Sequence, residues 1–265
     1  MKKLLLLSAI PLILSLSSCE CMVNSFAFFP DKDSVLSPEK LPPSAQEVTI
    51  PTSDGIKIQG IYFKRDNNPG RVIIYFHGNA GNLYHRIDES VMLMKSGWDV
   101  LLIGYRGYGK SEGSPSEKGV YKDGEAALNY AAETLGYKLN MICLYGRSLG
   151  TTVAVYTAQN RQLSRVVLIT PLSSGDDMAE IFTGSFLSSF VGGTFDSIGR
   201  INNITVPVLV IHGTSDEVVP YIQGKMLYDK FTGSKKMVTI QGGRHNDLEF
   251  THPEIYWGSI FEFLK

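Results

Sequence analysis

One five-residue stretch of the chain has the composition of a nucleophilic turn. Residues 146–150 read Gly-Arg-Ser-Leu-Gly, which fits the pattern G-x-S-x-G. In this pattern a serine lies on a sharp turn between a strand and a helix, and the glycines let backbone and helix approach closely. The apolar run 141–145 precedes the motif as a predicted strand, and residues 149–159 follow it as a predicted helix. Ser148 is therefore a candidate nucleophile, and its hydroxyl would need an activating base.

Two later loops supply a candidate acid and a candidate base. Asp216 follows the predicted strand 208–211, and His245 follows the predicted strand 237–240. Both lie beyond strand ends, where open α/β sheets bind ligands, and the order Ser, Asp, His is the one expected after such a motif. In a triad of this kind the histidine takes the serine proton and the carboxylate orients the imidazole. The substitute acids are Asp247, Asp176 and Asp177.

An acyl-transfer site also needs backbone N–H donors for the oxyanion of the tetrahedral intermediate. One is expected from Leu149, directly after the candidate nucleophile, where the predicted helix N-terminus offers a favourable field. The second is expected from the loop 77–81, after the predicted strand 72–76, and Asn79 is the residue chosen. His77 is interpreted as a loop-shaping residue. No metal and no cofactor are expected, because the other histidines lack ligand spacing: His85, His212 and His252.

The elements that must hold these residues alternate between short apolar runs and helical stretches. Two early runs, 48–50 and 56–63, flank Ser53-Asp54-Gly55, which predicts a hairpin. The later runs lack polar alternation, as buried strands of a parallel sheet do. These runs are 72–76, 100–103, 141–145, 166–169, 208–211 and 237–240, and the predicted helices are 83–95, 121–135, 149–159, 222–231 and 253–264. The pattern predicts an α/β fold with a mostly parallel central sheet, antiparallel N-terminal strands and helices on both faces.

Length and composition are consistent with one large domain and exclude some classes. The chain has 265 residues, of which 43% are hydrophobic and 19% charged, so a sizeable core is expected. The 25 basic and 26 acidic residues balance, which argues against a nucleic-acid partner. Three cysteines cannot form a disulfide framework. Cys143, inside a predicted strand, is interpreted as a small buried hydrophobe.

The N-terminus has the features of a targeting segment. Lys2 and Lys3 precede a short apolar run, and the following Leu16-Ser17-Ser18-Cys19 resembles a bacterial lipoprotein cleavage box. This predicts a signal peptide over residues 1–18 and lipidation of Cys19, although an ordinary signal peptide is the alternative. A lipid on Cys19 would anchor the protein to a membrane of the bacterial cell envelope without spanning it.

The rest of the chain divides into an N-terminal segment and the domain. Residues 19–44 have no clear period and are rich in proline, which predicts a tether or an arm packed on the domain. The domain itself is predicted to cover residues 45–265.

A second motif points to different chemistry. Residues 104–111 satisfy the phosphate-loop pattern G-x-x-x-x-G-K-[ST], and a predicted strand precedes them. A true phosphate loop opens into a helix, whereas residues 112–115, Glu-Gly-Ser-Pro, disfavour one here. No later predicted strand ends in an aspartate suited to Mg²⁺, since the run 166–169 leads into Thr170 and Pro171. Nucleotide hydrolysis is therefore disfavoured.

In chain order, these motifs resemble those of the α/β-hydrolases. The matching segments are 77–79, 104–111, 146–150, 216–220 and 245–247. More narrowly, they are similar to the serine aminopeptidase-like branch, which includes bacterial lipoproteins and eukaryotic depalmitoylating thioesterases. The resemblance runs from about Val48 to the C-terminus. It implies Ser148 as nucleophile, Asp216 as acid, His245 as base, and Asn79 with Leu149 as the oxyanion hole.

The residues and the resemblance together predict a serine hydrolase. It would cleave an ester, thioester or amide bond through an acyl-enzyme, as a carboxylesterase or a lysophospholipase- or thioesterase-like enzyme. A peptidase of the serine aminopeptidase-like type is the alternative enzyme. The hypothesis from a different functional class is a non-catalytic binding lipoprotein. The expected partners are a small acyl or lipid-like substrate and, through the lipid anchor, a membrane.

The resemblance also implies that residues 171–206 form a short cap insertion. Its apolar residues are predicted either to pack onto the domain or to line an acyl-binding cleft. They are Phe182, Phe186, Leu187, Phe190 and Val191.

Overall fold

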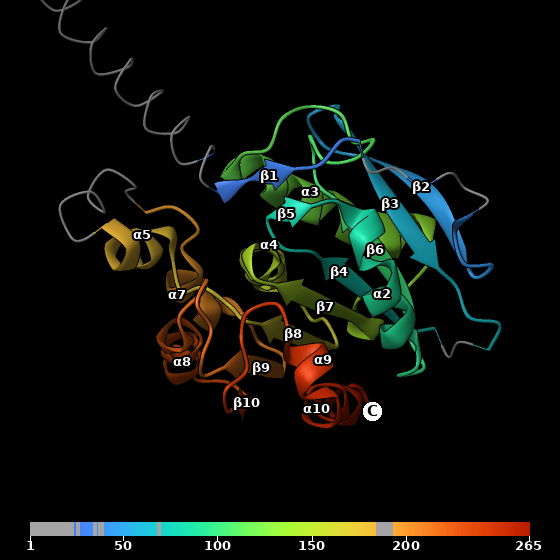
Figure 1. Cartoon of the computed structure of the whole chain (residues 1–265). Helices are drawn as coiled ribbons and strands as arrows, with labels where there is room; N and C mark the ends of the chain where they lie inside the picture. The colour runs from blue at the N-terminus through green and yellow to red at the C-terminus, as the bar shows by residue number, and fades with distance from the viewer. Residues whose placement is uncertain (1–23, 25–26, 34–35, 37–39, 68–69, 184–192) are drawn as a thin grey trace, which may run out of the picture.

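The computed structural model describes residues 24, 27–33, 36, 40–67, 70–183 and 193–265 (Figure 1). The predicted signal peptide and Cys19 lie outside these residues, so their predictions are not tested. The same holds for four of the apolar cap residues and for the side chain of Phe182.

The apolar runs form one eight-stranded sheet, in the order β10-β9-β8-β7-β4-β6-β3-β2. β2 pairs antiparallel with β3, and β3 antiparallel with β6, whereas the other neighbours are parallel. The strands are β2 (Ala45–Pro51), β3 (Lys57–Phe63), β4 (Val72–Phe76), β6 (Asp99–Gly104), β7 (Ile142–Arg147), β8 (Arg165–Ile169), β9 (Val208–Gly213) and β10 (Lys235–Ile240). The predicted sheet, with its antiparallel N-terminal strands, is therefore confirmed.

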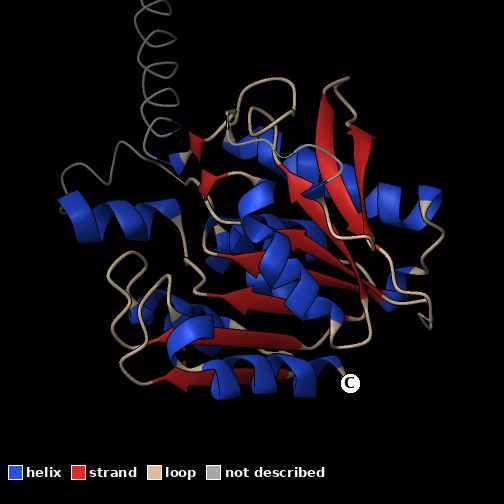
Figure 2. Ribbon diagram, turned by 45° about the vertical axis from the view of Figure 1, so that its right-hand side comes forward, coloured by secondary structure: helices blue, strands red, loops and turns tan. Residues whose placement is uncertain are grey.

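Each central strand is buried on both faces because helices cover both sides of the sheet (Figure 2). In β4, Ile74 and Phe76 belong to one hydrophobic cluster, and Ile73 and Tyr75 to the other. The first cluster packs against α3 (Glu117–Asn129), α4 (Leu149–Ala158) and α8 (Tyr221–Lys230), and the second against α2 (Ile87–Met94) and α10 (Pro253–Leu264). This arrangement explains why the strands show no polar alternation in sequence.

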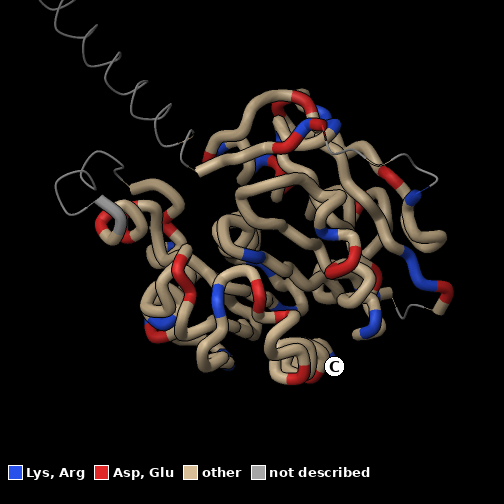
Figure 3. The backbone as a smooth tube through the Cα atoms, viewed as in Figure 1, with Lys and Arg blue, Asp and Glu red and all other residues tan. Residues whose placement is uncertain are grey.

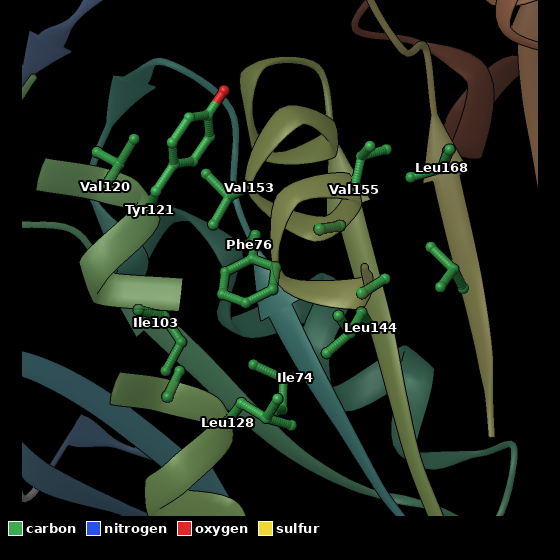
Figure 4. Close-up of a cluster of buried hydrophobic side chains, with 14 of the residues drawn as sticks. Ile74, Phe76, Ile103, Val120, Tyr121, Leu128, Leu144, Val153, Val155 and Leu168 are labelled. Carbon is green, nitrogen blue, oxygen red and sulfur yellow. The ribbon is translucent and has the colours of Figure 1, made fainter. Parts of the chain in front are cut away.

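The first cluster fixes the position of α4, the helix that follows the G-x-S-x-G motif. Figure 4 shows Val153 of α4 beside Phe76 of β4 and Tyr121 of α3, and Val155 of α4 beside Leu168 of β8. All five side chains are almost fully buried. A close-packed helix keeps its N-terminal residues in one place relative to the strand ends.

Two helix predictions need correction. The helix predicted over 121–135 begins at Glu117, because the Ser116 hydroxyl caps it by accepting the Gly119 N–H, and it ends in a π-helical turn, Tyr130–Thr134. The helix predicted over 83–95 is a 3-10 turn, Leu83–Arg86, followed by α2. Periodicity marked the apolar positions but missed the polar cap and the change of helix type.

Short elements surround the carboxyl ends of the parallel strands. Strand β1 (Phe29–Pro30), in the N-terminal arm, pairs parallel with β5 (Ala80–Gly81) beyond the end of β4. Residues 171–206, the predicted cap insertion, contain α5 (Gly175–Thr183), α7 (Ser197–Arg200) and a 3-10 turn (Ile201–Asn203). Helix α9 (Leu248–Thr251) follows β10. At the opposite end of the strands, the 3-10 turn Leu139–Met141 precedes β7. In Figure 1, β1 and α5 both lie toward the β7 strand end that bears the motif.

Basic and acidic positions are interspersed along the chain, and no stretch of one sign dominates the view in Figure 3. Within the described residues, no helix is both long and apolar enough to cross a bilayer. Cys143 is a free cysteine buried in β7, and its burial raises the pKa of the thiol to about 12.

Candidate active site

Ser148 lies at the turn between β7 and α4, with a backbone φ of 52°. A non-glycine residue in this region is strained, and the surrounding structure must hold it there. The flanking glycines make the turn possible. A Cβ atom on Gly146 would lie 2.6 Å from the Gly150 carbonyl oxygen, and one on Gly150 would lie 2.0 Å from the Phe76 carbonyl oxygen. The motif therefore forms the sharp strand-to-helix turn expected from the sequence.

The three residues predicted as a triad form one hydrogen-bonded line. His245 Nε2 lies 3.0 Å from Ser148 Oγ, and His245 Nδ1 lies 2.8 Å from Asp216 Oδ2. All three residues are nearly buried, at 8%, 5% and 7% exposure for Ser148, His245 and Asp216. The residues come from loops after β7, β9 and β10, whose carboxyl ends meet at one edge of the sheet.

The Asp216 carboxylate is held by more than the imidazole. Its Oδ1 accepts hydrogen bonds from the N–H groups of Val218 and Val219, at 2.9 and 2.7 Å. Its Oδ2 also lies 3.2 Å from Nε2 of His212, a fully buried histidine at the end of β9. Burial alone would raise the pKa of Asp216, but the hydrogen bonds from His212 and His245 outweigh it and lower this pKa below its ordinary value. Asp216 is therefore ionised and can orient the imidazole.

Sequence reasoning missed the contact of His212 with Asp216. The signal that could have found it is the spacing of four residues between His212 and Asp216, directly after a buried strand. The substitute acids take other partners: Asp247 accepts the Arg244 N–H, Asp177 the Ser173 hydroxyl and Asp176 the Gly193 N–H. Among the described residues, no cluster of His, Cys, Asp or Glu could hold a metal ion.

Of the two predicted oxyanion donors, Leu149 directly follows the serine, and Asn79 belongs to a loop that packs against the serine turn. Leu149 is the first residue of α4, so its N–H has no acceptor within the helix. The loop bearing Asn79 packs against the turn, because a Cβ atom on Gly78 would lie 3.5 Å from the Ser148 Cβ. Because Gly78 has no side chain, the backbone of this loop can come as close to Ser148 as an oxyanion hole requires.

Two tyrosines and His77 fix the conformation of this loop. His77 is fully buried, and its Nδ1 lies 2.6 Å from the Gly78 carbonyl oxygen, so Nδ1 carries the proton. The Tyr105 hydroxyl donates to the His77 carbonyl oxygen at 2.9 Å, and the Tyr108 hydroxyl donates to the Asn79 carbonyl oxygen at 2.6 Å. His77 therefore shapes the loop, as its position in the sequence suggested.

The buried His77 makes folding stability depend on pH. Burial lowers its pKa from 6.5 to about 3, so the imidazole stays neutral in the folded protein. The unfolded chain binds a proton below pH 6.5, which favours unfolding as the pH falls toward 3. Between pH 7.5 and pH 5.0 we expect this group to lower the free energy of unfolding by about 2 kcal/mol.

Urea unfolding at the two pH values measures this effect. In a His77→Gln variant the loss of stability on acidification should be smaller by about that amount, about 2 kcal/mol. His252→Gln, the same substitution at a histidine that is not fully buried, is the control. Equal losses in wild type and His77→Gln would contradict a neutral buried His77.

A buried ionic cluster joins the serine turn to the histidine loop. Arg147, which directly precedes Ser148, donates to Glu89 of α2 at 3.1 Å and to both carboxylate oxygens of Glu249 of α9 at 2.7 and 3.1 Å. Glu89 also accepts hydrogen bonds from the hydroxyls of Tyr75, Tyr145 and Tyr256. Burial would raise the pKa of Glu89, but the Arg147 charge and the tyrosine hydroxyls lower it. Nothing in the sequence pattern indicated this cluster.

The segment 104–111 does not have the structure of a phosphate loop. Lys110 forms an ion pair with Glu47 at 2.8 Å, and the Ser111 hydroxyl donates to the Gly104 carbonyl oxygen at 2.8 Å. The next helix, α3, begins only at Glu117. With Tyr105 and Tyr108 buried against His77, the segment instead supports the loop that bears Asn79.

Comparison with known proteins agrees with this architecture. Residues 71–190 match the family described as "alpha/beta hydrolase fold", and residues 176–249 match "Serine aminopeptidase, S33". The esterase Pf2001 of Pyrococcus furiosus has the same fold, with a TM-score of 0.73 at 20% identity over 89% of this chain and 96% of its own.

Two sequence relatives are similar over most of the chain. The α/β-hydrolase domain-containing protein WAV2 of Arabidopsis thaliana is 31% identical over 252 residues, covering 87% of this chain and 82% of the relative. The human α/β-hydrolase domain-containing protein 17B is 31% identical over 215 residues, covering 81% and 72%. The chain belongs to the α/β-hydrolase superfamily, among the α/β-hydrolase domain-containing proteins.

Proposed function

We propose that the protein is a serine hydrolase that transfers an acyl group to water. The observation that carries this proposal is the position of His245, whose two ring nitrogens lie within hydrogen-bonding distance of Ser148 Oγ and Asp216 Oδ2. A buried, ionised carboxylate fixes the imidazole with Nδ1 protonated, so that Nε2 can act as a base toward the hydroxyl. The strained backbone at Ser148 presents the hydroxyl at the end of the sheet.

The reaction would proceed in two halves. Ser148 Oγ attacks the carbonyl carbon while His245 accepts its proton, and the negative oxygen of the intermediate accepts hydrogen bonds from the N–H groups of Leu149 and Asn79. His245 then protonates the leaving group, which leaves an acyl group on Ser148. Water, deprotonated by His245, hydrolyses this ester and regenerates the hydroxyl. Each oxyanion donor contributes about 3–4 kcal/mol to transition-state stabilisation.

The substrate class we propose is a small acyl or lipid-like ester or thioester. Support comes from the predicted lipidation of Cys19, which would hold the enzyme at a membrane of the bacterial cell envelope, where acyl substrates are concentrated. The apolar composition of the cap residues around 182–191 agrees with an acyl-binding role. The esterase Pf2001 is a structural neighbour whose name also indicates ester hydrolysis.

A peptidase activity is the second candidate function. The observation in its favour is the match of residues 176–249 to the serine aminopeptidase family, a region that includes Asp216 and His245. A Ser-His-Asp triad can cleave both esters and amides, so the leaving group that the enzyme prefers distinguishes an esterase from a peptidase. The binding-lipoprotein alternative is disfavoured because a ligand-binding role does not require three residues in triad geometry.

Matched substrates with one acyl group and different leaving groups test the proposal. We expect turnover of p-nitrophenyl esters from acetate to palmitate and of the corresponding thioesters, together with labelling of wild-type protein by a fluorophosphonate at Ser148. Faster cleavage of N-terminal aminoacyl anilides than of every ester would favour the peptidase. Folded wild-type protein that neither labels nor turns over any of these substrates would contradict a serine hydrolase.

A further inference from the structure

The N-terminal arm contacts the loop that bears Asn79 through its main chain. In the parallel pairing of β1 with β5, the Phe29 N–H donates to the Asn79 carbonyl oxygen at 2.9 Å, and the Asp31 N–H donates to the Gly81 carbonyl oxygen at 2.9 Å. We call residues 28–31 the arm segment. It is separated by about fifty residues of sequence from the loop that it contacts.

Both peptide groups that flank Asn79 are fixed by hydrogen bonds. The preceding one contains the Gly78 carbonyl and the Asn79 N–H, and His77 Nδ1 holds it by donating to that carbonyl oxygen. The following one contains the Asn79 carbonyl, which accepts from both the Phe29 N–H and the Tyr108 hydroxyl. Because a peptide group is planar, the held Gly78 carbonyl sets the direction of the Asn79 N–H within its plane. The held Asn79 carbonyl fixes the next peptide plane, so the backbone on both sides of the Asn79 Cα is restrained.

The arm segment is itself anchored on two sides. Its Asp31 carbonyl oxygen accepts from the Gly109 N–H at 2.9 Å and from Asn82 Nδ2 at 3.2 Å, so it joins the loops after β4 and β6. The Phe28 side chain is only 5% exposed and packs edge-to-face against Phe195 of the cap insertion, with 6.0 Å between ring centroids. These contacts are more than a flexible tether would make.

We propose that the arm segment is a positioning element of the oxyanion hole. The main-chain N–H groups of Phe29 and Asp31 hold the Asn79 loop in the conformation that stabilises the tetrahedral intermediate. This inference rests on the proposed function, because it takes the Asn79 N–H as an oxyanion donor. The main chain of this segment, which leads from the predicted lipid anchor, thereby positions a donor of the oxyanion hole.

Proline substitution removes one N–H donor without removing an acceptor. Phe29→Pro deletes the hydrogen bond to Asn79, and Phe29→Ala is its matched control, since the Phe29 side chain is 52% exposed and the alanine keeps the N–H. Asp31→Pro deletes the hydrogen bond to Gly81, with Asp31→Ala as control. Pro30 before it already lies in extended backbone, which proline requires of the preceding residue.

With p-nitrophenyl butyrate, we expect both proline variants to lose kcat by about 10- to 100-fold, less than the loss for a deleted oxyanion donor. KM should change by less than about threefold, because only the transition state develops the oxyanion. The rate of fluorophosphonate labelling should fall in parallel, while the alanine controls stay within about twofold of wild type. A wild-type melting temperature in the proline variants would separate positioning from general stability.

Two results would overturn this inference. One is a wild-type kcat in both proline variants while wild-type protein labels and turns over normally, which would leave the proposed function standing. The other is a loss of activity that follows the fraction of folded protein, with kcat per labelled site unchanged. Absence of activity in wild-type protein is a different failure, because it would remove the proposed function and this inference together.

Discussion

Replacing Ser148 with alanine is expected to lower kcat for any substrate by at least about 10⁴-fold and to abolish fluorophosphonate labelling. The reason is that Ser148 Oγ lies 3.0 Å from His245 Nε2, in line with Asp216. Residual turnover would come from the oxyanion hole and substrate binding alone.

The fold should survive this substitution. The Ser148 hydroxyl makes one hydrogen bond to His245, and the loss of one such bond changes stability by about 1 kcal/mol. Ester turnover and thermal unfolding are measured side by side, with Ser96→Ala as control, because the Ser96 hydroxyl bonds only its own helix end. Turnover of Ser148→Ala within tenfold of wild type would show that another group is the nucleophile.

The largest effect on stability is expected from Gly150→Ala. An added Cβ atom would lie 2.0 Å from the Phe76 carbonyl oxygen and 2.6 Å from the His77 carbonyl oxygen, both backbone atoms that cannot move separately from β4. Helix α4 would have to shift away from the sheet, against the buried packing of Val153 and Val155. We expect a loss of at least about 4 kcal/mol, which lowers the melting temperature by about 10 °C or more.

Gly258→Ala is the matched control for this experiment. Gly258 lies in α10, and no atom lies within 4 Å of the position that its Cβ would take. Alanine is the better helix former there, so the control should be neutral or more stable by up to about 1 kcal/mol. Melting curves and soluble yield measure both variants. A wild-type melting temperature for Gly150→Ala would mean that the turn is less tightly packed than described.

The sequence was sufficient to predict the sheet and to choose three residues that the structure brings into one hydrogen-bonded line, because both predictions depend on local signals. Strand β4 was predicted with its observed bounds, because its five apolar residues lie between polar ones and all five are buried in the structure. The motif around Ser148 and the loops after two buried strands placed the three candidate residues without knowledge of the fold. Chain order then restricted the possible roles.

Contacts between distant segments could not be predicted in this way. Arg147 donates a hydrogen bond to Glu249 although 102 positions separate them in the sequence. No pattern in the residues next to either one indicates this pairing. The two-residue strand β1 was equally hidden, because its hydrogen bonds come from main-chain groups that every residue except proline has. The same limit applies to the support that Tyr105 and Tyr108 give to the Asn79 loop.

The Arg147 cluster has a consequence for the motions of the loop that carries His245. Opening this loop locally would move α9 and take Glu249 away from Arg147, which would leave Arg147 and Glu89 as a buried pair with one partner lost. Leaving a buried charge without its ion-pair partner costs several kcal/mol. The N–H groups of residues 250–252 are hydrogen-bonded within this segment. Their hydrogen exchange should therefore be nearly as slow as that of the central strands, so that the histidine loop unfolds with the sheet as one cooperative unit.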